Sequence, residues 1–214
     1  MIGLTIGGKH TYDDFGLKML SFYVSFPKVY EEKINVPGRN GPLDVSEALT
    51  GEPIYQDRKL SSKYDLYGPN LTLRDEKISE ISNYIHGKYL RIVHDKYPEF
   101  YYEGRITIDS KQKNALFHEV TIEADIKPFK LRRNKTVISA NITGEQTVIC
   151  PNLRMSTVPE ITADASFSLM FGNVTAEVKP GTCIIPDIKF VEGSNAIVCT
   201  GTGNITFTYQ EGSL

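Results

Sequence analysis

Glycine-rich segments are the first places to look for ligand chemistry in this 214-residue sequence. Gly7-Gly8-Lys9 carries part of a phosphate-binding loop, but the full spacing of glycine, lysine and hydroxyl is absent. Gly201-Thr202-Gly203 lacks the third glycine of a dinucleotide fingerprint, and a strand-like segment follows it instead of a helix. We interpret both segments as turns and predict no cofactor.

Cysteine and histidine side chains, the usual nucleophiles, bases and metal ligands, are few and scattered. No Cys-x-x-Cys pair occurs among Cys150, Cys183 and Cys199, and all four histidines lie earlier in the sequence than these cysteines. We expect buried, reduced thiols. His86 and His94 lack the neighbouring ligands of a zinc site, so we interpret them as surface or capping residues.

Carboxylates and serines show no catalytic pattern either. Asp13 and Asp14 are adjacent, so on a strand their side chains would face opposite sides. No serine occupies a Gly-x-Ser-x-Gly elbow. The paired carboxylates of a glycosidase meet only in space, so the sequence neither identifies nor excludes them. We predict no catalytic or metal-binding residue and expect that the protein is not an enzyme.

The overall composition is that of a folded protein without a strongly charged partner. The chain has 24 basic and 26 acidic residues and is 40% hydrophobic, which is too apolar for disorder and too neutral for a nucleic-acid-binding face. No run of 18 apolar residues predicts a membrane span. The first residues lack the charged and apolar segments of a signal peptide. We expect a soluble protein made in the cytoplasm.

Alternation of apolar and polar residues predicts strands along most of the chain. The alternating segments are 21–26, 34–36, 106–109, 120–126, 166–171 and 205–209, and a further strand is expected over 88–93. Dense turn signals interrupt them at Pro37-Gly38-Arg39-Asn40-Gly41-Pro42 and at 110–114. The fold class is therefore mainly β.

One helix is predicted, over about 75–86. Asp75-Glu76 places negative charge where the positive end of a helix dipole would lie. An isoleucine stripe with helical spacing follows, and Gly87 is a typical terminating residue. A shorter helical turn is expected over 45–50, where Ser46 can cap it and Gly51 can end it.

The two halves of the chain differ in charge. Residues 1–132 carry 19 basic and 19 acidic side chains, whereas residues 133–214 carry 5 and 7. Eleven of the twelve tyrosines precede residue 103. The change falls at a basic stretch opened by Pro128, which is typical of a domain junction. We place one domain over 1–132 and a second, all-strand domain over 133–214.

Several turn and strand motifs resemble the distal tail proteins of long-tailed, non-contractile bacteriophages. They lie at 8–17, 36–44, 47–51, 86–88, 101–104, 192–195, 201–203 and 209–212. The motifs occur in both halves, so the resemblance spans nearly the whole chain. They are structural signatures and include no catalytic group.

The resemblance implies an N-terminal β-sandwich-like domain that builds a ring and a C-terminal galectin-like β-sandwich. It implies a homohexamer at the phage tail tip, which joins the tail tube protein to the tail-associated hub or lysin protein and to receptor-binding proteins. Double-stranded DNA would pass through the channel without specific binding, and no membrane partner is expected. The protein would reside in the virion after assembly in the cytoplasm of the host bacterium.

A ring subunit must bury two different flanks through a heterologous contact that closes. Residues 37–58 are too polar and rich in turns for a core, so we predict an arm that grips a neighbouring subunit. The expected interface residues are Pro37, Gly38, Arg39, Asn40, Leu43, Tyr55 and Arg58. We also expect acidic or neutral side chains around the channel, since these do not hold phosphate.

The main alternative is a carbohydrate-binding module that attaches a particle or an enzyme to the bacterial cell wall. Such a module needs exposed aromatic rings beside polar groups in a shallow groove. Most aromatic residues of the second half follow the alternation of a buried face, which argues against this alternative.

Overall fold

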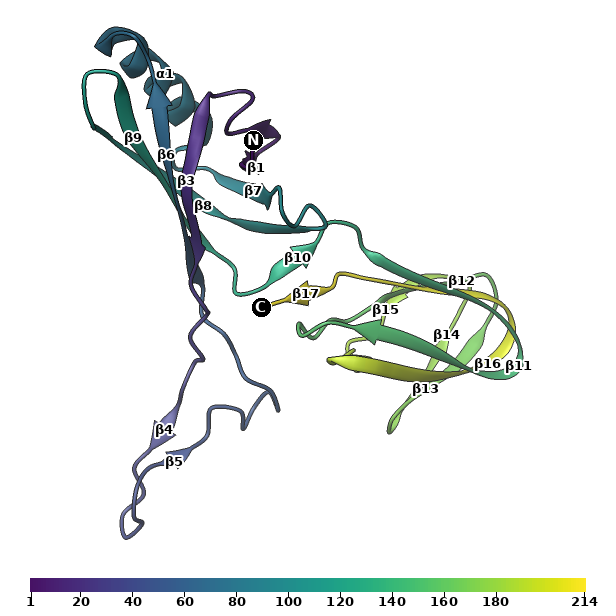
Figure 1. The fold of residues 1–214 in the computed structure, drawn as a ribbon. Coiled ribbons are helices and arrows are strands. Elements are labelled where there is room, and N and C mark those ends of the chain that lie inside the picture. Colours follow the sequence, from purple (N-terminus) through teal and green to yellow (C-terminus); the bar gives the residue numbers. More distant parts are fainter. The chain divides into compact units, whose positions relative to one another are not determined.

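The computed structural model describes residues 1–214, and antiparallel strands make up most of it (Figure 1). One α-helix is present, so the predicted mainly-β class is confirmed. The chain divides into an N-terminal unit, Met1–Pro128, and a C-terminal unit, Phe129–Leu214. This division lies four residues before the boundary expected from composition.

The N-terminal unit is one twisted antiparallel sheet with a helix. Its elements are β1 (Leu4–Ile6), β2 (Lys9–His10), β3 (Leu17–Val24), β4 (Lys33–Ile34), β5 (Leu43–Asp44), β6 (Arg58–Tyr67), α1 (Leu71–Ile85), β7 (Tyr89–His94), β8 (Phe100–Gln112) and β9 (Phe117–Ile126). The main sheet has the order β2-β1-β7-β8-β9-β6-β3, and β4 and β5 form a separate pair. The strand β3 is therefore an edge strand.

The core of this unit lies on one face of the sheet. In β9, Val120, Ile122, Ala124 and Ile126 are all buried and alternate with more exposed residues, which confirms the strand predicted over 120–126. Buried isoleucines of α1 belong to the same cluster, so the helix covers this face (Figure 1). The opposite face carries the polar residues of the alternation and stays exposed.

The helix begins earlier than predicted, at Leu71. Asn70 caps it, because its side-chain oxygen accepts a hydrogen bond from the Leu73 N–H at 2.9 Å. Asp75 and Glu76 therefore lie beyond the first turn, and the negative charge there does not mark the start. The predicted end is confirmed, since Gly87 adopts a φ of 73° directly after the C-cap His86.

His94 corrects the prediction of a surface histidine. It is buried at the end of β7, with its ring 4.5 Å from that of Phe22, and its Nδ1 accepts a hydrogen bond from the Lys96 N–H. Burial lowers the pKa of its imidazole. His86, by contrast, is an exposed capping residue, and its Nδ1 accepts a hydrogen bond from the Ile108 N–H.

The C-terminal unit is a β-sandwich built around two long strands. Its elements are β10 (Lys130–Arg132), β11 (Thr136–Asn152), β12 (Glu160–Ala163), β13 (Phe167–Phe171), β14 (Val174–Val178), β15 (Gly181–Ile184), β16 (Gly193–Tyr209) and β17 (Gly212–Ser213). The strands β11 and β16 pair along their whole lengths. The first half of β16 also pairs with β13 and its second half with β12, so the two halves contribute to different layers.

Gly201 and Gly203 lie inside β16, which corrects their interpretation as a turn. A Cβ at Gly203 would lie 2.4 Å from the Asp164 carboxylate, and one at Gly201 would lie 2.8 Å from the Ser166 carbonyl oxygen. The glycines allow the close approach of these neighbours where β16 changes partner strand.

The thiols behave largely as predicted. Cys150 and Cys199 are fully buried and reduced, and burial raises their pKa to about 12 and about 11. Cys183 is also reduced but only half-buried, which corrects the expectation for this residue. The structure contains no helix with the length and hydropathy needed to cross a bilayer.

Candidate subunit interface

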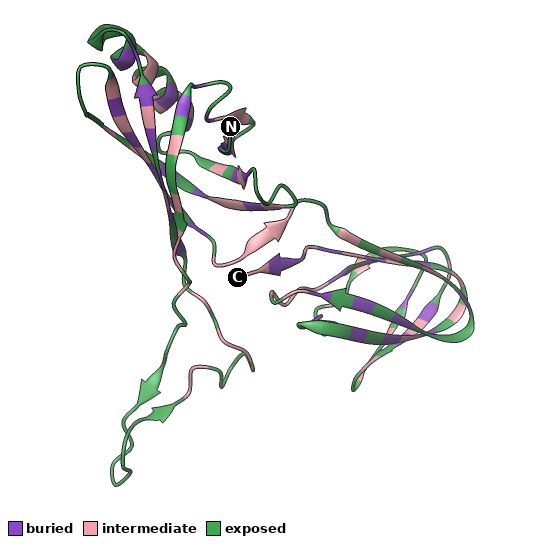
Figure 2. Ribbon diagram, in the orientation of Figure 1, coloured by how far each residue is buried: buried purple, intermediate pink, exposed green.

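Residues 25–57 form an arm that leaves the sheet after β3 and returns to it at β6 (Figure 1). No residue of the arm is buried, and Figure 2 shows most of it as exposed, with a few stretches of intermediate exposure. The arm therefore starts well before the predicted 37–58 segment. Because it has no core of its own, hydrophobic burial within the subunit does not stabilise it.

Backbone hydrogen bonds run along the arm as in a loose hairpin. At its root, the Ser25 N–H donates to the Lys59 carbonyl at 2.9 Å, and the Lys59 N–H donates to Ser25 Oγ at 2.9 Å. Farther out, Tyr30 and Ile54 are joined by a 2.7 Å bond. The β4–β5 pair follows, with Lys33 opposite Asp44. The arm thus has a defined path although it lacks a core.

The turn expected over 45–50 is present as a single turn that ends at Gly51, whose φ is 70°. Ser46 does not cap it, which corrects that prediction. Its Oγ accepts a hydrogen bond from the Glu32 N–H at 2.8 Å and donates to the Asp44 carboxylate at 2.5 Å. Ser46 therefore ties the turn to the opposite side of the arm.

Large apolar side chains of the arm face solvent. The side chain of Leu49 is fully exposed and that of Phe26 is 86% exposed. The other exposed apolar residues of the arm are Val29, Tyr30, Ile34, Val36, Leu43 and Ile54. The half-buried strand faces predicted at Phe26 and at 34–36 are therefore wrong. Eight such side chains on one segment are typical of a surface that a partner covers.

Most of the predicted interface residues lie on this exposed arm. Pro37, Gly38, Arg39 and Asn40 form the turn between β4 and β5, and Leu43 begins β5. Tyr55 is half-buried and forms a β-bridge with Val29. The structure brings these six residues onto one segment.

Arg58 lies in a different environment. It is only 5% exposed at the start of β6, and its guanidinium carbon lies 5.4 Å from the centre of the Tyr102 ring. Its Nε and Nη2 atoms have no hydrogen-bond partner, and burial lowers its pKa. Arg58 therefore packs within the subunit at the root of the arm and is not part of the exposed surface.

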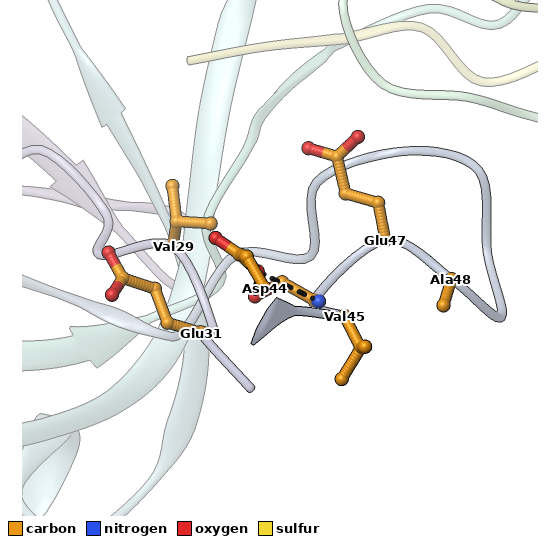
Figure 3. Close-up of a pocket in the computed structure, with 7 residues that line it drawn as sticks. Val29, Glu31, Asp44, Val45, Glu47 and Ala48 are labelled. Atoms are coloured by element: carbon orange, nitrogen blue, oxygen red, sulfur yellow. Dashed lines mark hydrogen bonds between the residues drawn. The ribbon is translucent and has the colours of Figure 1, made fainter. Parts of the chain in front are cut away.

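Carboxylates surround a shallow hollow of about 560 Å³ on the arm (Figure 3). Glu31, Asp44 and Glu47 line it together with Val29, Val45, Ser46 and Ala48. Hydrogen bonds from Ser46 lower the pKa of Asp44, so its carboxylate is charged at neutral pH. The arm holds three basic and six acidic residues in all. Its surface is therefore both apolar and negative.

The groups considered for chemistry are not assembled into a site. Asp13 and Asp14 lie in a turn, where both bind His10, instead of on a strand. No group of three or more histidine, cysteine, aspartate or glutamate side chains is placed to hold a metal ion. Gly7 and Gly8 form the turn between β1 and β2, as predicted.

Comparison with known proteins identifies the fold. No family model and no curated protein matches the sequence. Among solved structures, the chain is similar to the Dit protein of the phage SPP1, whose structure is described as a paradigm of the hub adsorption apparatus in phages that infect Gram-positive bacteria. The TM-score is 0.70 at 15% identity, over 98% of this chain and 99% of that chain. The distal-tail-protein fold indicated by the sequence motifs is thus confirmed over nearly the whole length.

Proposed function

We propose that this protein is a structural subunit of a phage tail tip, where six copies close into a ring. The observation that carries the proposal is the arm: an ordered segment with eight exposed apolar residues and no core, on a fold that SPP1 Dit shares. An apolar segment of this kind is stabilised when another surface covers it. A neighbouring copy in a closed ring provides that surface for every arm.

In this proposal the ring joins the tail tube protein to the tail-associated hub or lysin protein and to receptor-binding proteins. The hub role that is described for SPP1 Dit supports these partners. Double-stranded DNA passes through the channel, which acidic or neutral side chains line so that phosphate is not retained. The protein resides at the tail tip of the virion, after assembly in the cytoplasm of the host bacterium.

A purely structural role agrees with what the side chains offer. The carbohydrate-binding alternative gains no support from the C-terminal unit, because none of its aromatic side chains is exposed. They are Phe129, Phe167, Phe171, Phe190, Phe207 and Tyr209. An aromatic platform for a sugar ring is therefore missing from this unit.

Deletion of the arm tests the proposal. Val24 and Leu60 are cross-strand neighbours, so the register places Phe26 opposite Arg58, and residues 27–57 can be replaced by a two-residue Asn-Gly turn that joins β3 to β6. We expect light scattering to give the mass of a hexamer for the full chain and of a monomer for the deletion variant. Retention of the far-UV circular dichroism signal controls for folding. Hexamers formed without the arm would refute the proposal.

A further inference from the structure

Four basic residues gather at the opposite side of the sheet from the arm. We call them the basic edge: Lys9 in β2, Lys88 directly before β7, Arg91 in β7 and Arg105 in β8. Arg91 and Arg105 share one face of neighbouring strands, since Arg105 lies opposite Tyr89, whereas Lys9 and Lys88 lie over Tyr84 of α1 on the helix side of the same edge. Lys88, Arg91 and Arg105 are exposed and Lys9 is half-buried.

These cations contact aromatic rings and backbone, not carboxylates. The Nζ atoms of Lys9 and Lys88 lie 4.6 and 5.6 Å from the centre of the same Tyr84 ring. The Arg91 guanidinium lies 4.6 Å from the Tyr101 ring. Such contacts leave the positive charge in place.

The nearby carboxylates are engaged elsewhere. Glu103, which lies opposite Arg91 in the register, forms its ion pair with Lys127 at 2.7 Å. Asp125, which lies opposite Arg105, is 3.9 Å from Lys59. Arg105 itself donates from Nη1 to the Gly87 carbonyl at 2.6 Å. No ion pair joins any residue of the basic edge to a carboxylate of the same chain, so the edge keeps its charge.

The arm carries the opposite charge, and its carboxylates are similarly available. Glu32 and Glu47 are exposed and form no ion pair, and Glu47 lines the hollow of the arm beside Asp44. Glu31 is paired only with Lys33 of the arm itself. The arm as a whole has six acidic and three basic residues, so its net charge is negative.

The order of the strands places these two surfaces on opposite flanks of the unit. The arm leaves from β3 and β6 at one side of the sheet, and the basic edge lies on β2, β7 and β8 at the other. Within one subunit, β9 therefore separates β8 of the basic edge from β6 at the root of the arm. A heterologous contact between identical copies needs two different complementary surfaces on two flanks, which is the arrangement seen here.

We propose that the basic edge is the surface that receives the arm of the next copy, with its cations facing the carboxylates around the arm's hollow. This inference rests on the proposed function and adds the receiving surface and the pairing of charges. Exposed apolar residues of the arm, such as Leu49, cover the aromatic side chains of the edge. That cover excludes water and strengthens the attraction between the charges.

Charge reversal and charge exchange in the full chain test the inference. The variant K88E/R91E reverses the edge and E32K/E47K reverses two carboxylates of the arm. We expect each to weaken hexamer assembly at least about tenfold, measured by sedimentation velocity over a concentration series. The combined four-residue variant restores assembly, because opposite charges face each other again. The exposed control pair K135E/K179E, with the same change in net charge, assembles as the wild type.

Two further measurements separate the outcomes. Thermal unfolding of K88E/R91E and of the milder K88Q/R91Q shows that the subunit still folds, and raising the salt concentration weakens assembly of the wild type. Hexamers that are insensitive to both reversals would overturn this inference and leave the ring proposal standing. A wild-type chain that stays monomeric would overturn both. Unchanged hexamers whose edge instead binds a DNA duplex would assign the cations to phosphate and overturn the inference.

Discussion

The sheet of the N-terminal unit and its arm are consecutive parts of one chain, yet they are stabilised differently. In the sheet and the helix that covers it, fifteen hydrophobic residues form a cluster with almost no exposure. In the arm, residues 25–57, not one residue is buried. The sheet therefore buries its apolar residues within the chain, whereas those of the arm remain exposed. In the proposed ring, the sheet stabilises the fold of each copy and the arm contributes its apolar surface to the contact between copies.

The largest expected contrast comes from removing one apolar side chain in each region. Ile122→Ala in β9 creates a cavity among fully buried residues and should lower the free energy of unfolding by about 4 kcal/mol. Leu49→Ala in the arm removes a fully exposed side chain and should change it by less than about 0.5 kcal/mol. Urea unfolding at a protein concentration below that of assembly measures both.

The two substitutions should affect hexamer assembly in the reverse order, with the larger effect from the arm. Leu49→Ala is expected to weaken hexamers, whereas Ile122→Ala leaves them intact under conditions in which the variant remains folded. A large loss of monomer stability in Leu49→Ala would mean that the arm packs on its own subunit, which would break the contrast between the two regions.

Replacing a glycine in the sheet and one in the arm should give a second, smaller difference in the free energy of unfolding. A Cβ at Gly104 in β8 would lie 2.1 Å from the Asp125 carbonyl oxygen of the neighbouring strand, so Gly104→Ala forces the backbone apart and should cost about 3 kcal/mol. Gly41 in the arm has open space around it and a φ of 79°. Gly41→Ala should cost about 1 kcal/mol, from backbone strain alone. Equal losses in urea unfolding would contradict the distinction.

The sequence predicted the strands of the sheet well because alternation reports which residues share a face. Val120, Ile122, Ala124 and Ile126 are buried as expected. The same alternation at Ile34 and Val36 predicted a buried face that does not exist, since a period of two does not say what covers the face. The turn residues predicted the position of the arm. They did not predict that it begins at residue 25, because Phe26 continues the alternation of apolar and polar residues in β3.

The rest of the candidate interface could not be predicted from local sequence. Lys9, Lys88, Arg91 and Arg105 are scattered over nearly a hundred residues, and only the pairing of β1, β7 and β8 gathers them. Arg58 was assigned to the exposed arm because it ends a polar segment. In the structure it is the first residue of β6 on the buried face, one position inside the sheet.

The smallest expected contrast between sheet and arm is in their response to pH. His94 is buried in the sheet and its pKa is lowered, chiefly by burial and further by the positive charge of Lys96, although Asp95 acts in the opposite direction. Its Nδ1 already accepts a backbone hydrogen bond, so a proton there would also break that contact. The arm contains no histidine.

The free energy of unfolding should therefore be highest above the unfolded-state pKa of histidine, about 6.5. It should fall as the pH drops through that value, because the unfolded chain takes up a proton that the folded sheet resists, and it should level off below the folded pKa of His94. His94→Gln should flatten this dependence in urea unfolding, and the exposed His86→Gln is the matched control. An equal pH dependence of the free energy of unfolding in His94→Gln and in the wild type would contradict the assignment to His94.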